Sequence, residues 1–214
     1  ERLNGQIYDA NRPMLLSLLN SNYLETIDMG IVKDKRKDLA NKYDECLSKS
    51  DVVISSGGAS DGIEDHTQNA LKDIGAKCIV WQLAMKPGKP MAIGLLGKKI
   101  IFCLPGNPVA AFVCTKLLIK PLIIKLAGGV NLNPLSIKLP SGFVHNKKTG
   151  RAEYLRAKII NEDAKSFIML HGRKGAGVIS SLTGADGIVE IPMEYESVVK
   201  GDLLNFFPFD HRGL

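Results

Sequence analysis

The sequence predicts an α/β domain, with helices on both faces of a mainly parallel sheet, followed by a small all-β, barrel-like domain. Strand-like and helix-like segments alternate over residues 1–132, which is the pattern of a parallel sheet covered on both sides. Over residues 133–214, short apolar runs recur between turn residues, and no helical stripe is convincing. The pattern changes between Gly128 and Pro134. We therefore expect one domain at 1–132 and a second at 133–214.

Each element of the first part is predicted by a local pattern. Asn11 is expected to cap a helix that has Pro13 in its first turn. The apolar run over residues 51–56 suits a buried parallel strand, and it leads into Gly57 and Gly58. The other expected elements, in order, are a strand over 24–32, helices over 36–49 and 66–74, a strand over 77–84, a loop over 86–90, short strands around Ile93 and Ile101, and an apolar helix over 107–128 that Pro121 kinks.

The strands of the second part are predicted by apolar runs that turn residues separate. Strands are expected near Ile137 and over residues 155–159, 167–170, 178–182, 187–191 and 202–207.

The net charge of +6 is spread thinly along the chain. There are 28 Lys and Arg residues against 22 Asp and Glu, without a basic block or a ladder of aromatic residues between basic ones. Nucleic-acid-binding proteins concentrate positive charge on one element or face, so we expect no nucleic acid. No stretch of about 18 apolar residues exists, so we expect no membrane span.

The four cysteines, at positions 46, 78, 103 and 114, lack CxxC spacing, and the four histidines lack metal-ligand spacing. We therefore expect neither a zinc site nor a disulfide framework, and a reducing, cytoplasmic compartment. The chain begins with Glu1 rather than with Met or a signal peptide, and we expect it to be part of a longer protein.

A glycine-rich segment is the strongest candidate for a binding site. The sequence SSGGASDGIED at 55–65 follows a predicted buried strand and precedes a predicted helix. Glycines at this position let backbone N–H groups approach an anion, and Ser60 adds a hydroxyl donor. Three carboxylates close together can hold a divalent cation through oxygen ligands. The alternative is an ordinary helix N-terminus at which Ser and Asp are caps. The carboxylates are those of Asp61, Glu64 and Asp65.

Two further loops carry proline, glycine and polar residues. In KPGKP at 86–90, two lysines are presented together, and lysine suits phosphate or another oxyanion. The alternative is a solvated basic hairpin. In LPGNP at 104–108, a strand runs into a turn that opens a helix, a geometry prone to bind anions. Here the alternative is that Asn107 simply caps the helix. Neither GxxxxGK[ST] nor GxGxxG occurs, which argues against ordinary nucleotide-binding loops.

Taken in chain order, these motifs resemble the molybdopterin molybdenumtransferases, the bacterial MoeA and gephyrin E-domain family. The resemblance runs nearly end to end, and the KPGKP and LPGNP pair in series with the GGxSxG loop is highly specific. It is carried by NGQIYDANR at 4–12, SSGGASDGIEDHT at 55–67, MKPGKPM at 85–91, LPGNPVAA at 104–111 and GRAEYLR at 150–156.

The resemblance implies an enzyme of molybdenum cofactor synthesis. Such enzymes take adenylylated molybdopterin and molybdate, insert the metal and release AMP, assisted by a divalent cation such as Mg²⁺. It implies a molybdopterin-binding fold whose first strand lies before residue 1, a β-barrel-like final domain, and a homodimer in the full-length protein. A molybdopterin adenylyltransferase is the implied upstream partner. This chain is then expected to be an incomplete and poorly active portion.

The resemblance also assigns roles to individual positions. The catalytic residues implied are Asp34, Asp65, Lys86 and Lys89. The cation ligands implied are Asp34, Glu64 and Asp65. The substrate-binding residues implied are Ser56, Gly57, Gly58, Ser60, Gly62, Pro105, Gly106, Asn107 and Pro108.

Two positions depart from the family pattern. Gln82 stands where the family often has a lysine, and Ala176 stands where a serine is often found. Either change can weaken oxyanion binding or shift the preference from molybdate towards tungstate. Two alternatives stay open: a molybdopterin adenylyltransferase-like enzyme, and a gephyrin-like, non-enzymatic scaffold that binds receptor peptides.

Overall fold

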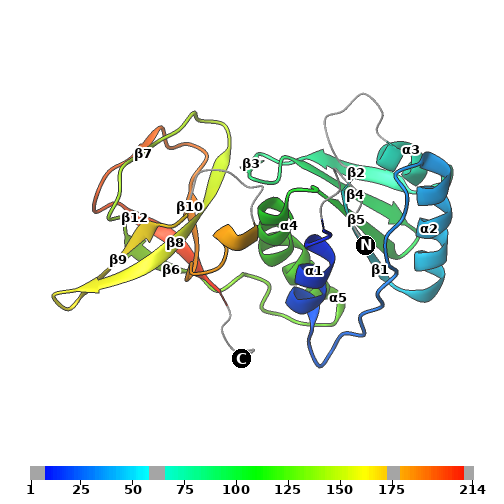
Figure 1. Ribbon diagram of the computed structural model, residues 1–214, viewed down its shortest axis with the longest axis horizontal. Coiled ribbons are helices and arrows are strands. Elements are labelled where there is room, and N and C mark those ends of the chain that lie inside the picture. Colours follow the sequence, from blue (N-terminus) through cyan, green and yellow to red (C-terminus); the bar gives the residue numbers. More distant parts are fainter. Residues whose placement is uncertain (1–7, 58–65, 173–178, 210–214) are drawn as a thin grey trace.

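The computed structural model describes residues 8–57, 66–172 and 179–209. Figure 1 shows two regions side by side. We call the described residues up to 126 the α/β region and residues 137–209 the β region. No helix in the described ranges is both long enough and apolar enough to cross a membrane.

The α/β region is built on a four-stranded sheet with the order β1-β5-β4-β2. Only β1 and β5 are parallel; β5 with β4 and β4 with β2 run antiparallel. The expected parallel sheet is therefore only partly confirmed. The reason is a hairpin: Leu96 pairs with Lys99, and Gly97 at φ 59° begins the two-residue turn that joins β4 to β5. The strands are β1 (Val52–Ser56), β2 (Lys77–Gln82), β4 (Pro90–Leu96) and β5 (Lys99–Leu104).

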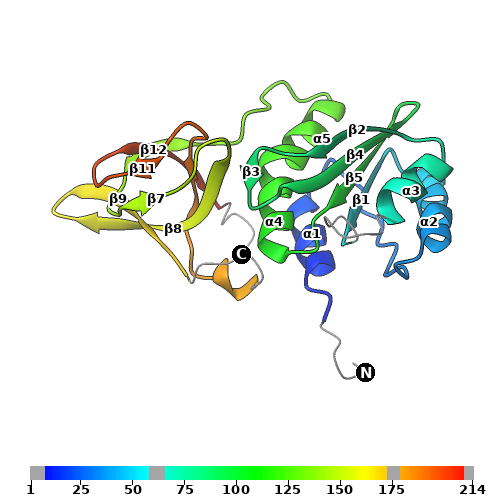
Figure 2. The same cartoon turned by 90° about the horizontal axis from the view of Figure 1, so that it is seen from above.

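Helices cover both faces of this sheet, as expected (Figures 1 and 2). Successive side chains of β5 alternate between the faces, because a strand has a period of two residues. Phe102 and Leu104 join the core on the side of α1, α4 and α5, whereas Ile101 and Cys103 join the core under α2 and α3. The helices are α1 (Asn11–Leu19), α2 (Arg36–Lys49), α3 (His66–Asp73), α4 (Pro108–Cys114) and α5 (Lys120–Leu126).

The apolar helix expected over 107–128 is interrupted by one wider turn. A π-helical turn, η1 (Thr115–Ile119), separates α4 from α5, and the N–H of Lys120 donates to the carbonyl of Thr115. Pro121 follows directly and has no N–H to donate. A proline and a π-turn are both recognised causes of a bend in a helix, so the irregularity lies where the sequence predicts it.

The β region is a sheet that curls without closing. Its order is β3-β8-β10-β12-β6, with β9 on the other side of β8. A single bridge between Ser141 and Ile168 connects the chain after β6 to β9. The strands are β6 (Ile137–Pro140), β8 (Ala152–Glu162), β9 (Lys165–Leu170), β10 (Gly187–Ile191) and β12 (Leu203–Pro208), with β7 (His145–Asn146) and β11 (Ser197–Val198) as a separate pair.

One strand of this sheet comes from the other region. β3 (Met85–Lys86) belongs to the chain segment between β2 and β4, yet it pairs in parallel with β8. Helix α4 supports the same junction: the rings of Phe112 and Phe209 meet edge to face with centroids 5.0 Å apart. The two regions therefore share backbone hydrogen bonds and an apolar contact.

Two expected strands are wrong. Residues 24–32 form no strand; instead Asp28 accepts a hydrogen bond from the N–H of Gly30, a local bond that competes with strand pairing. The part of 178–182 that the structure describes contains a 3₁₀ turn, η2 (Ile179–Ser181). The hydroxyl of Thr183, two residues after this turn, donates to the carbonyl of Ser180.

Candidate functional site

The two glycine-containing turns that follow β1 and β5 lie side by side. These strands are parallel neighbours, so their carboxyl ends meet at one edge of the sheet, where ligands of open α/β sheets bind. The N–H of Gly57 donates to the carbonyl of Leu104 at 3.2 Å, and the Ser56 hydroxyl donates to the carbonyl of Pro105 at 3.2 Å. A Cβ at Gly106 would lie 3.5 Å from the Cα of Gly57. Both predicted loops thus share one edge.

Asn11 ties the first helix to these two turns. Its Nδ2 donates to the Ser56 hydroxyl at 2.7 Å and to the carbonyl of Gly106 at 2.9 Å. The side chain is buried, with an exposed fraction of 9%. The expectation that Asn11 caps α1 is wrong, because the residue lies inside the helix and Asp9 accepts from the N–H of Arg12 instead.

Asn107 does cap its helix. Its Oδ1 accepts from the N–H groups of Val109 at 3.1 Å and Ala110 at 3.4 Å, and Pro108 lies in the first turn of α4. This is the alternative stated for LPGNP. Two of the first N–H groups of α4 are therefore already paired within the loop.

The KPGKP loop is fixed between the two regions. Met85 pairs with Ala152 and Lys86 with Glu153 where β3 meets β8. The Lys86–Pro87 peptide bond is cis, and Gly88 is buried with φ 119°. A Cβ at Gly88 would lie only 2.7 Å from the Sγ of Cys114 on α4, so glycine is required for the loop to approach this helix.

The KPGKP loop and the LPGNP loop both line one cavity of about 200 Å³. It brings together four of the predicted site residues and adds Arg151, which directly precedes β8. Two lysines and one arginine, drawn from both regions, thus contribute to the lining of one small space, and these residue types suit an oxyanion. Its lining is Met85, Lys86, Pro87, Gly88, Lys89, Pro105, Asn107, Ala110 and Arg151.

One carboxylate balances part of this positive charge. Glu153 accepts from the Lys86 ammonium through Oε1 at 2.9 Å, and its Oε2 lies 2.9 Å from the Nε2 of His145. Burial acts to raise the pKa of Glu153, but the hydrogen bonds from Lys86 and His145 outweigh it and hold the pKa below its ordinary value. Glu153 is therefore ionised at neutral pH, and Lys86 is an ion-paired lysine.

The other predicted residues are placed differently. Four of them lie where β1 and β5 end and are not part of the cavity lining. They are Ser56 and Gly57 after β1, and Gly106 and Pro108 after β5. Asp34 is exposed, precedes α2 and is not part of that lining. The predicted residues Gly58, Ser60, Gly62, Glu64 and Asp65 lie outside the described residues.

Sequence reasoning assigned no role in the site to four residues that the structure places at or beside it: Asn11, His145, Arg151 and Glu153. Signals for three of them existed, because Asn11 lies in NGQIYDANR, and Arg151 and Glu153 lie in GRAEYLR. Both motifs carried the resemblance without a stated chemistry. No sequence motif pointed to His145, because its contact with Glu153 is apparent only in the folded structure.

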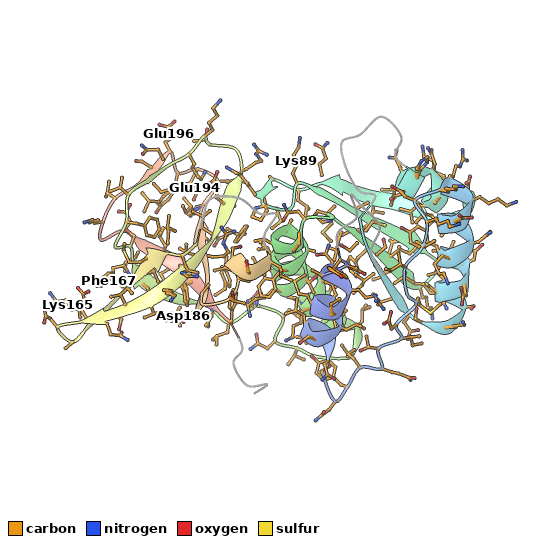
Figure 3. The ribbon with its side chains drawn as sticks, viewed as in Figure 1. Lys89, Lys165, Phe167, Asp186, Glu194 and Glu196 are labelled. Carbon is orange, nitrogen blue, oxygen red and sulfur yellow. The ribbon has the colours of Figure 1, made fainter. Side chains whose placement is uncertain are left out.

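A second, larger cavity of about 530 Å³ lies nearby and differs in character. Its lining includes Glu190 and Glu194 and no lysine or arginine. The hydroxyl of Tyr154 donates to Glu190 at 2.8 Å, and the amide of Asn205 donates to the same carboxylate at 2.9 Å. Carboxylates repel an oxyanion, so this cavity does not suit the same ligand. Figure 3 shows Glu194 on the β region, while Lys89 lies between the two regions.

The fold and the cavity define an α/β protein whose candidate site gathers cations at the junction with a second, β-rich region. A family model described as a probable molybdopterin binding domain matches residues 1–125, more than half of the chain. The chain belongs to this family. A second family model, described as the MoeA C-terminal region (domain IV), matches residues 138–209.

Similar proteins agree with this assignment. The molybdopterin molybdenumtransferase of Haemophilus influenzae is 33% identical over 210 residues, which cover 97% of this chain and 52% of the relative. The molybdenum cofactor synthesis protein cinnamon of Drosophila melanogaster is 31% identical over 192 residues, 88% of this chain and 31% of its own length. A crystal structure of a molybdopterin biosynthesis MoeA protein from Pyrococcus horikosii matches with a TM-score of 0.80 and 30% identity, over 98% of this chain and 50% of that one. The chain thus spans about half the length of such relatives, or less.

Proposed function

We propose that this chain is part of an enzyme that inserts molybdate into adenylylated molybdopterin and releases AMP. The observation that carries the proposal is the cavity in which the KPGKP loop, the LPGNP loop and Arg151 meet. The proposal is supported by the family of the chain and by the relatives named molybdopterin molybdenumtransferase.

The residues of the cavity suit the charge changes of this reaction. When AMP leaves, an oxygen of water or of molybdate forms a new bond to the molybdopterin-side phosphorus of the pyrophosphate. The bond from that phosphorus to the bridging oxygen breaks, the bridging oxygen leaves on AMP with the electron pair, and any proton of the attacking water passes to solvent. Ammonium and guanidinium donors held near that oxygen stabilise the charge that develops. Lys86, Lys89 and Arg151 are the groups in place for this role, and molybdate, itself an oxyanion, suits the same donors.

The predicted divalent cation depends on a different set of residues. Of its three proposed ligands only Asp34 is described, and its exposed carboxylate alone does not make a Mg²⁺ site. Within residues 8–57, 66–172 and 179–209, no group of three His, Cys, Asp or Glu residues is placed to hold a metal ion. We propose Mg²⁺ as a cofactor that Asp34, Glu64 and Asp65 would hold.

The β region favours this function over that of a molybdopterin adenylyltransferase. Arg151 comes from the β-region side of the junction, and Glu153 on β8 pairs with Lys86. An adenylyltransferase unit needs no such region. The proposal further includes a homodimer of the full-length protein, a molybdopterin adenylyltransferase as the upstream partner, and a cytoplasmic location.

The test of the proposed activity is AMP release from adenylylated molybdopterin in the presence of molybdate. It is measured on the longest form of the protein that contains these 214 residues. We expect Lys86→Ala to abolish molybdate-dependent AMP release while the protein stays folded, with a lower melting temperature because Glu153 loses one of its two partners. Lys165→Ala is the matched control, because Lys165 lies at the far tip of the β8–β9 hairpin (Figure 3). Full turnover by Lys86→Ala contradicts the proposal.

A further inference from the structure

The ammonium group of Lys86 is held by a residue of the β region. Lys86 and Glu153 are register partners on β3 and β8, and their side chains form an ion pair of 2.9 Å. Because the two strands are hydrogen-bonded neighbours, the backbone sets the distance between these side chains. The contact therefore comes from the junction of the two regions rather than from a chance meeting of surface groups.

The two partners differ sharply in exposure. The side chain of Lys86 is 61% exposed, whereas those of Glu153 and His145 are 10% and 14% exposed. Both carboxylate oxygens of Glu153 have partners, Lys86 on Oε1 and His145 on Oε2. A buried carboxylate that is held at both oxygens has one orientation. It therefore offers the exposed lysine a fixed point of attachment.

We propose that Glu153, oriented by His145, is a positioning residue that holds the Lys86 ammonium group at the anion-binding cavity. The inference rests on the proposed function, in which that cavity takes an oxyanion. A lysine ammonium has three N–H donors, and Glu153 accepts from one of them. The remaining donors stay available to a ligand. Without Glu153, the flexible lysine side chain must lose its rotational freedom whenever a ligand binds.

The opposite role makes the opposite prediction. If Glu153 competed with the ligand for Lys86, removing its charge would free the ammonium and strengthen oxyanion binding. If Glu153 positions Lys86, removing its charge weakens binding, because the hydrogen bond that holds the ammonium becomes a neutral one. Arg151 lies in the same cavity lining and keeps the site cationic while Glu153 is ionised. The sign of the change in affinity therefore decides between the two roles.

The experiment measures molybdate binding by isothermal titration calorimetry to the longest form of the protein that contains these 214 residues, with Glu153→Gln as the test variant. Glutamine keeps the shape of the side chain and removes the charge. We expect the affinity for molybdate to fall on the order of tenfold, the usual effect of weakening a charge-assisted hydrogen bond. Glu190→Gln is the matched control: Glu190 also has two hydrogen-bond partners, lies opposite Tyr154 on the neighbouring strand β10, and makes no contact with Lys86. We expect the control to change the affinity by less than about twofold.

A second readout follows Lys86 itself. In ¹H–¹⁵N NMR of lysine ammonium groups, a held ammonium gives a signal protected from exchange with water. We expect the Lys86 signal to be visible in the unmodified chain and in Glu190→Gln, and lost in Glu153→Gln. A residue that only stabilised the fold would not change this signal in a folded variant. If Glu153→Gln does not fold, His145→Gln replaces it, with the same two measurements and the same expected direction.

The outcomes separate the two proposals. If the unmodified chain and Lys86→Ala bind molybdate equally, or if neither binds it, the proposed function fails and this inference fails with it. If Lys86→Ala weakens binding but Glu153→Gln behaves as Glu190→Gln does, the proposed function stands and the positioning role is overturned. Tighter binding by Glu153→Gln overturns it too, in favour of competition.

Discussion

The side-chain amide of Asn11 donates to the hydroxyl of Ser56 at 2.7 Å, although 45 residues separate the two in sequence. The same amide donates to the carbonyl of Gly106. One buried side chain of α1 thus holds the turn after β1 and the turn after β5 together. These two turns border the candidate site. Helix α1 therefore helps to fix the geometry of the site, although it is far from the turn after β5 in sequence.

Replacing Asn11 is expected to loosen this edge. Asn11→Ala leaves the Ser56 hydroxyl and the Gly106 carbonyl without this donor, which costs about 1–3 kcal/mol in the free energy of unfolding. Urea denaturation at pH 7 measures the change. The control is Asn20→Ala: Asn20 is exposed and follows the same helix, so the expected change is within about 0.5 kcal/mol. Equal stability of the two variants would show that Asn11 does not secure the turns.

Gly88 is expected to tolerate no side chain. Its φ of 119° disfavours any other residue, and a Cβ would lie 2.7 Å from the Sγ of Cys114. Gly88→Ala should therefore lower the free energy of unfolding by about 2–4 kcal/mol, from backbone strain and overlap together. Gly201→Ala isolates the first contribution, since Gly201 has φ 96° but nothing within 4 Å of a Cβ, and should cost about 1–2 kcal/mol. Chemical denaturation compares them, and equal costs would contradict the close contact with α4.

The ion pair of Glu153 predicts a particular dependence of stability on pH. The pKa of Glu153 in the folded chain lies below its ordinary value of 4.5, so the carboxylate stabilises the fold above that pH. This contribution is lost as the pH falls from about 4.5 through the lower, folded-state pKa. We therefore expect the unmodified chain to lose more stability than Glu153→Gln between pH 6 and pH 3. The measurement is the free energy of unfolding of both proteins at each pH, and parallel curves would contradict the assignment.

Local sequence patterns predict much of this fold and part of its site. The helices over 36–49 and 66–73, the run after Asp51 and the cap at Asn107 follow from periodicity and capping residues within a few positions. The hairpin at Gly97 also has a local signal, a glycine followed by two lysines between two apolar runs, and it turns the expected parallel sheet into a mixed one.

The remaining features depend on contacts between distant segments. Residues 24–32 carry a strand-like composition, but a strand also needs a neighbouring strand, and here Asp28 bonds locally to Gly30. Lys86 and Glu153 are 67 residues apart, and no spacing rule within the sequence predicts that they pair. Sequence patterns therefore predict the two loops of the cavity. The GRAEYLR motif contains Arg151 and Glu153, but only the fold shows that they lie beside these loops, together with His145.

The most direct test asks whether the binding of molybdate depends on Lys86. Isothermal titration of molybdate into the longest form of the protein that contains these 214 residues, at fixed pH and ionic strength, compares the unmodified protein with Lys86→Ala and Lys165→Ala. Loss of one charge-assisted contact predicts an affinity at least about tenfold weaker for Lys86→Ala, with one site per chain in the unmodified protein. Lys165→Ala should bind as the unmodified chain does. Equal molybdate affinity in Lys86→Ala and the unmodified chain would contradict the central claim.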